Sequence, residues 1–204
     1  MEPLLALTPA LREHYTAAEQ QYMNRLLQRK PLMLDVQRTP RWKDVLGIGP
    51  PSSGQYMGDK TQGLVQLRTA RPGDERAGLA HETAHQFHFD MIPGMVPDDV
   101  GRMIQVLRDA AQSDPNFKQN LIRQHPHTAG LFEPEAPPHT DARGFASGPP
   151  GLMEYLAMMY EMPRSGIPIP GTKAFPQGRL PVTPETQKFR PLIDSYALFF
   201  EEGF

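Results

Sequence analysis

The sequence predicts a single α+β domain, in which an N-terminal helix is followed by a small mixed sheet and then by further helices. Three observations support this class. Apolar residues recur at helical spacing before residue 31 and again after residue 74, and short strand-like runs lie between these two regions. No internal repeat is present, and 204 residues suffice for one hydrophobic core. We therefore expect one domain over residues 1–204, with residues 1–30 forming its N-terminal helix.

The first third of the chain is expected to contain one long helix and three strands. A Thr-Pro pair at residues 8–9 is a typical helix start, and apolar residues at helical spacing continue to about residue 30. Three later runs have the length and composition of strands, namely residues 32–36, 54–57 and 63–68. A turn around residues 58–60 is expected to join the last two strands.

The remainder is expected to be helical, with one long connection. Helix starts are predicted at residue 74 or 75, at Pro97, at Pro115 and near residue 184. Residues 152–162 are apolar almost all round, which indicates a buried helix. The proline-rich residues 126–150 are expected to form a long loop over the surface.

Composition excludes several classes of protein. The 21 basic and 23 acidic side chains give a net charge of −2, which argues against nucleic-acid binding through a basic face. No run approaches the ~18 apolar residues that a membrane span requires. The chain has no cysteine, which excludes disulfides, thiolate zinc sites and thiol nucleophiles. The first residues are acidic where a classical signal peptide is basic, so we expect a soluble protein, either cytoplasmic or delivered by a route without such a peptide.

One motif carries chemistry, the HExxH pattern that reads HETAH at residues 81–85. On a helix, positions i and i+4 lie on one face, so His81 and His85 can each direct a ring nitrogen at one Zn²⁺. Glu82 then reaches a metal-bound water as its base. The apolar side chains of this segment fall on a different face, namely Ala77, Ala80, Ala84, Phe87 and Met91. We therefore expect one zinc ion per chain.

A catalytic zinc site has three protein ligands and one open position, so a third ligand is needed. We favour Glu154, because an acid in an apolar helix is costly to bury unless a cation pairs with it. Glu161, two turns later, is the alternative on the same segment. Asp90 is turned away from the histidine face.

Several histidines are weaker candidates. His88 shares the face of His85 and is expected behind the ligands or at the rim of the site. The metzincin pattern is excluded, because its glycine and histidine positions hold His88 and Met91. The other histidines lie in or beside the proline-rich loop and are expected to be exposed, namely His125, His127 and His139.

Four stretches together resemble the anthrax lethal factor-like metallopeptidases, the family that includes the clostridial Pro-Pro endopeptidases. They are GLVQLR, LAHETAH, EYLAMMY and a C-terminal helix with Phe189, Leu192 and Ile193. The resemblance implies a zincin-like metallopeptidase domain with a catalytic core at residues 54–202 and the zinc ligands His81, His85 and Glu154. It departs from the family at one position, because Ser147 stands where a tyrosine stabilises the oxyanion. His139 and Arg143 are the replacements we expect.

Two functions follow from these residues. The first is a zinc endopeptidase, a toxin-like hydrolase in which a metal-activated water attacks the peptide bond and Glu82 is the general base. The alternative is a catalytically silent, zinc-stabilised module that binds a peptide or protein; a small-molecule metallohydrolase is a third, weaker hypothesis. In either of the first two cases we expect a protein or peptide partner bound as an extended strand along a free edge of residues 63–68.

Overall fold

A computed structural model describes residues 2–38, 53–58, 61–69, 72–124, 126–132, 139–140, 146–147, 150–165 and 184–202. Within these residues the chain has a mixed α+β fold with a four-stranded sheet and seven α-helices, as the sequence predicts. None of the helices described is long and apolar enough to cross a bilayer.

The main sheet contains four strands in the order β1-β2-β4-β3, namely β1 (Glu2–Leu4), β2 (Leu32–Arg38), β3 (Ser53–Gly58) and β4 (Gly63–Thr69). Strand β4 pairs in parallel with β2 and antiparallel with β3. Alternation along β4 explains its orientation, because Val65 and Leu67 are buried while Gln66 and Arg68 are exposed. The predicted strands are therefore confirmed, and β1 is an additional short edge strand that the sequence pattern does not predict.

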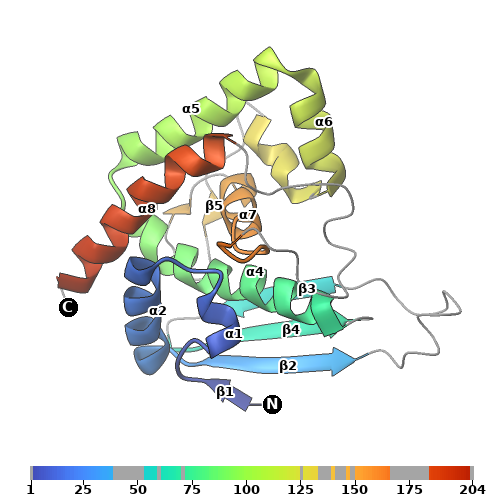
Figure 1. Ribbon diagram of the computed structural model, residues 1–204. Coiled ribbons are helices and arrows are strands. Elements are labelled where there is room, and N and C mark those ends of the chain that lie inside the picture. The colour runs from blue at the N-terminus through green and yellow to red at the C-terminus, as the bar shows by residue number, and fades with distance from the viewer. Residues whose placement is uncertain are drawn as a thin grey trace, which may run out of the picture.

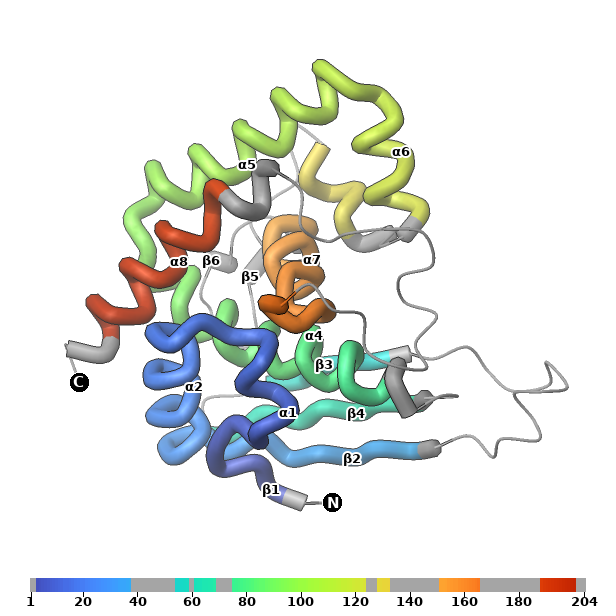
Figure 2. The backbone as a smooth tube through the Cα atoms, in the orientation of Figure 1, coloured from blue at the N-terminus to red at the C-terminus, as the bar shows by residue number. Residues whose placement is uncertain are grey.

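Helix α4 (Pro72–Met91) packs on the apolar face of the sheet. The predicted apolar stripe explains this packing, since all five of its side chains are buried: Ala77, Ala80, Ala84, Phe87 and Met91. Helix α7 (Pro150–Met158) packs against α4, so α4 lies between the sheet and α7 (Figures 1 and 2). The most apolar of the described helices is therefore buried, as predicted.

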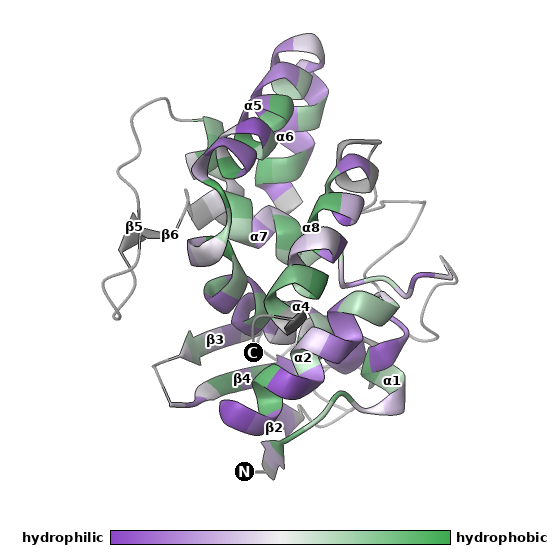
Figure 3. Ribbon diagram, turned by 90° about the vertical axis from the view of Figure 1, so that its left-hand side faces the viewer, coloured by the Kyte–Doolittle hydropathy of each residue, from purple (hydrophilic) through white to green (hydrophobic). Residues whose placement is uncertain are grey.

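The other helices surround this centre. Helices α5 (Pro97–Ser113) and α6 (Pro115–Gln124) lie farthest from the sheet, as the view turned by 90° also shows (Figure 3). Helix α8 (Pro184–Glu202) packs beside α2 (Ala17–Arg29), so the last described helix lies against a helix from the first 30 residues.

Two sequence predictions are corrected. The single N-terminal helix is two helices, α1 (Pro9–Arg12) and α2, because Thr16 caps α2 and exchanges hydrogen bonds with Glu19. Part of the expected surface loop is the 3₁₀ helix η2 (Pro126–Phe132), which packs on α7 and buries Leu131 completely.

The short strands β5 (His139–Thr140) and β6 (Ala146–Ser147) pair with each other within the same expected loop. A short 3₁₀ turn, η1 (Ile92–Gly94), ends α4 as its Pro-Gly pair predicts.

Candidate metal centre

The HETAH segment lies in the middle of α4, and its two histidines are on the side that faces α7. His81 and His85 are one turn apart, and their rings meet edge to face with centroids 4.8 Å apart. His81 is 7% exposed and His85 is partly buried. The two side chains are therefore largely shielded from solvent in the space between α4 and α7.

Glu154 enters this space from α7. Its Oε1 lies 3.3 Å from His81 Nε2, its Oε2 lies 3.4 Å from His85 Nε2, and the two Nε2 atoms are 3.1 Å apart. Ligands at about 2.0–2.1 Å from a tetrahedral zinc are themselves about 3.3 Å apart. The three donor groups thus have the spacing of a tetrahedral metal site, and they form a group that could hold a metal ion. A tetrahedral metal has a fourth coordination position, which none of these three residues would occupy.

Glu161 fixes the outer nitrogen of His81. Its Oε1 lies 2.8 Å from His81 Nδ1, and because a carboxylate only accepts, Nδ1 carries the proton and donates. In the neutral ring, Nε2 of His81 then presents its lone pair to the site. Carboxylates commonly orient metal-binding histidines in this way. The sequence allows Glu161 as a rival ligand, whereas the structure places it behind His81.

The charges of the site favour a cation. Burial disfavours the imidazolium of His81, but hydrogen bonds to Glu154 and Glu161 outweigh burial and raise the pKa of His81 to about 10. Burial lowers the pKa of His85, despite its contact with Glu154. The two carboxylates that raise the pKa of His81 would also stabilise a divalent metal ion, which His81, His85 and Glu154 would bind in place of that proton.

Glu82 lies beside the group without joining it. Its side chain is 7% exposed and rests against β3, where the backbone N–H of Tyr56 donates to its carboxylate. Burial raises the pKa of Glu82 to about 7, with the nearby carboxylates adding to this and a charged His81 opposing it. Gly54 permits the close approach, because a Cβ at that position would lie 2.8 Å from Glu82 Cδ. The sequence alone does not predict the roles of Gly54 and Tyr56.

The rival ligands whose side chains are described do not belong to the group formed by His81, His85 and Glu154. Asp90 Oδ2 lies 3.7 Å from Lys30 Nζ, on another side of α4. Of the two places expected for His88, the rim is wrong, because this residue is 1% exposed and its ring contacts those of Phe87 and Tyr160. Neither ring nitrogen of His88 has a hydrogen-bond partner among the described residues.

The remaining candidates lie outside the described side chains. His125 and Arg143 are outside the described residues, and for His127, His139 and Ser147 the structure describes the backbone alone. The predicted oxyanion donors therefore stay predictions.

The expected free edge of residues 63–68 is corrected. Strand β4 pairs on both sides, with β2 and with β3, so it has no free edge. Alternation of polar and apolar residues identifies a half-buried strand but not its neighbours. Among the described strands, β3 is the sheet edge next to α4, and its Tyr56 N–H already points out of that edge toward Glu82.

Comparisons with models of protein families, with curated proteins and with solved structures give no match to this chain.

Proposed function

We propose that this chain is a zinc-dependent endopeptidase of the zincin-like kind, with one zinc ion held by His81, His85 and Glu154. The observation that carries the proposal is the convergence of these three donors, 3.1–3.4 Å from one another, beside the separate buried acid Glu82. A zinc ion bound there would lower the pKa of a coordinated water and polarise a substrate carbonyl. The two histidines and one carboxylate match a known zinc ligand set of hydrolytic enzymes.

Glu82 is the proposed general base. Its carboxylate lies at the side of the ligand group, and its pKa of about 7 allows it to accept a proton and release it near neutral pH. The Tyr56 N–H donates to that carboxylate, and the absence of a side chain at Gly54 leaves room for it against β3.

The substrate is proposed to lie along β3. An extended peptide can add to an open sheet edge through main-chain hydrogen bonds. Because Glu82 is itself bonded at this edge by the Tyr56 N–H, a strand added to β3 would pass directly beside the proposed base. This replaces β4 by β3 and keeps the extended mode of binding.

Membership of the anthrax lethal factor-like metallopeptidases remains part of the proposal. It is supported by the place of Glu154, the glutamate of EYLAMMY, within reach of both histidines of HETAH. The same resemblance implies a toxin-like role.

The test compares three variants for zinc content and for cleavage of a random peptide library. Glu82→Gln should bind one zinc per chain and cleave at least ~10²-fold more slowly, the lower end of what a general base contributes. Glu154→Ala should lose most of its zinc. Glu75→Gln, two turns earlier on α4, is the matched control and should change neither property.

The outcomes separate the proposed enzyme from its alternative. If the wild type binds zinc and a peptide but cleaves nothing, and Glu82→Gln behaves identically, the chain is a zinc-stabilised binding module. Full zinc occupancy in Glu154→Ala, with loss on substitution of His88 or Asp90, would refute the ligand assignment.

A further inference from the structure

The hydrogen bond between His81 and Glu161 joins two segments that are 80 residues apart in the sequence, α4 and the turn after α7. Glu161 is not on α7 itself, which ends at Met158. Three successive turn bonds carry the chain onward, the last from Glu161 N to the carbonyl of Met158 at 3.2 Å. The position of the Glu161 carboxylate therefore depends on how this turn is held.

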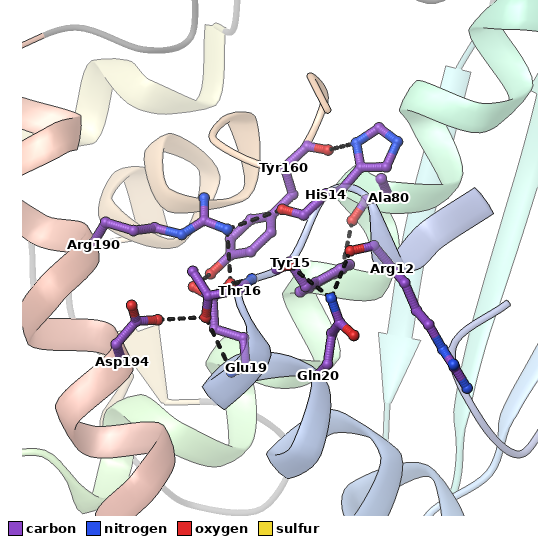
Figure 4. A network of polar contacts seen from close by, with 10 residues as sticks. All are labelled: Arg12, His14, Tyr15, Thr16, Glu19, Gln20, Ala80, Tyr160, Arg190 and Asp194. Atoms are coloured by element: carbon purple, nitrogen blue, oxygen red, sulfur yellow. Dashed lines mark hydrogen bonds and ion pairs between the residues drawn. The ribbon is translucent and has the colours of Figure 1, made fainter. Parts of the chain in front are cut away.

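The turn is held through its neighbour Tyr160. The Tyr160 hydroxyl donates to Glu19 Oε1 at 2.9 Å, and its carbonyl accepts from His14 Nδ1 at 2.5 Å. The guanidinium of Arg190 lies 4.7 Å from the centre of its ring. Tyr160 is completely buried, so its ring, hydroxyl and carbonyl are all fixed by other elements (Figure 4).

The other side of the bond is held through the residue before His81. The hydroxyl of Tyr15 donates to the carbonyl of Ala80 at 3.0 Å. Tyr15 is also completely buried, and its ring packs on Tyr160 with centroids 4.6 Å apart. The Tyr15–Tyr160 pair thus connects the sequence neighbours of His81 and Glu161 (Figure 4).

Glu19 and Arg190 anchor this pair. Arg190 Nη2 lies 2.7 Å from Glu19 Oε2, and the Thr16 N–H donates to the same oxygen at 2.7 Å. Glu19 is fully buried, and burial raises its pKa while Arg190 opposes the rise. The Arg190 side chain is 20% exposed, but separating the pair would leave the charge of Glu19 without water, so the pair permits little movement.

We propose that Tyr15 and Tyr160 are positioning residues for the metal centre: they set the distance between α4 and the turn after α7, and so hold the His81 ring at Glu161. This inference rests on the proposed function for its metal. It gives Tyr15, in the connection between α1 and α2 and outside the catalytic core expected from the sequence, a part in zinc binding.

The test removes single hydroxyls and measures zinc affinity by chelator competition, without any peptide. Tyr15→Phe and Tyr160→Phe should each weaken zinc binding by about 3- to 10-fold, less than the 10- to 100-fold typical of groups that contact a ligand directly. The spectrum of the Co²⁺-substituted protein should shift in both variants. Tyr196→Phe is the matched control, since its hydroxyl joins α8 to Asp99 at 2.6 Å, and its zinc affinity should stay within two-fold of wild type.

A double-mutant cycle separates positioning from general stability. If Tyr160 acts through Glu161, then Tyr160→Phe should have no further effect on zinc affinity in a Glu161→Gln background. Unchanged zinc affinity and Co²⁺ spectra in both tyrosine variants, with melting temperatures lowered as in Tyr196→Phe, would overturn the inference. A wild type that binds zinc but cleaves nothing refutes the peptidase alone, whereas a wild type that binds no zinc refutes both.

Discussion

Gly54→Ala is the perturbation that tests the placement of Glu82 most directly. The added Cβ would press on the carboxylate, 2.8 Å from Cδ and 2.9 Å from Cγ of Glu82. Ordinary carbon contacts are about 3.5–4.0 Å, so the carboxylate must retreat by roughly 0.7–1 Å and weaken its bond from the Tyr56 N–H. A misplacement of about 1 Å can cost about 10²-fold in rate. We expect this loss in kcat/KM for a library-derived peptide, with zinc affinity unchanged because Glu82 is not a ligand.

Stability should respond far less than activity. The clash falls on the end of a flexible side chain, so Gly54→Ala should cost no more than the roughly 1–3 kcal/mol typical of overpacking. Gly101→Ala is the control: no described atom lies within 4 Å of the position that its new methyl group would take, and alanine in a helix should stabilise by about 0.5–1 kcal/mol without changing turnover. Wild-type turnover in Gly54→Ala would refute the reasoning, because Glu82 would then not act from its place against β3.

Two further predictions concern Glu161 and His14. Glu161→Gln keeps an acceptor but removes the charge behind His81, so zinc affinity should fall about 10- to 100-fold, measured by chelator competition; an unchanged affinity would mean that Glu161 does not support the ligand. Burial, with a smaller effect from Arg76, lowers the pKa of His14 from 6.5 to about 4, so the unfolded chain binds the extra proton first as pH falls. Between pH 7 and 4.5 the metal-free protein should therefore lose about 2 kcal/mol more stability to urea than His14→Gln does, and equal losses would contradict this.

Local patterns explain the parts of the fold that the sequence predicts correctly. Helix α4 follows from apolar residues at helical spacing, and the β3–β4 pair follows from two strand-like runs with turn-forming residues between them in the sequence. Helix α7 follows from a segment too apolar to face water. The break before α2 also has a local signal, because Thr16 and Glu19 have the spacing of a capping box.

Pairing between distant segments is not predictable in the same way. The parallel partner of β4 is β2, and nothing in the alternation of β4 distinguishes a central strand from an edge strand. The error about its free edge has this origin. Strand β1 has only three residues, too few for a period to show.

In the candidate metal centre too, local spacing was predictable and contacts between distant segments were not. Fixed helical spacing predicts the two histidines of HETAH, and the cost of burying a lone acid predicts Glu154. The role of Glu161 depends on α7 ending at Met158, since only the following turn returns its carboxylate to His81 Nδ1. A continuous helix would have placed it two turns beyond Glu154, as another candidate ligand.

The environment of Glu82 bears on the choice between an enzyme and a silent binding module. Glu82 is 7% exposed and accepts a hydrogen bond from the Tyr56 N–H, while burial raises its pKa. A buried acid that is not a metal ligand weakens the fold, and a glutamine or an apolar residue of similar size would avoid that cost. A module that needs zinc only for stability gains nothing from this acid. An enzyme that must accept a proton beside a metal ion gains its base, and residues that serve catalysis are often those that a more stable protein would replace. The energetic cost of burying Glu82 is therefore better explained by the proposed peptidase than by the binding module, even with serine at position 147.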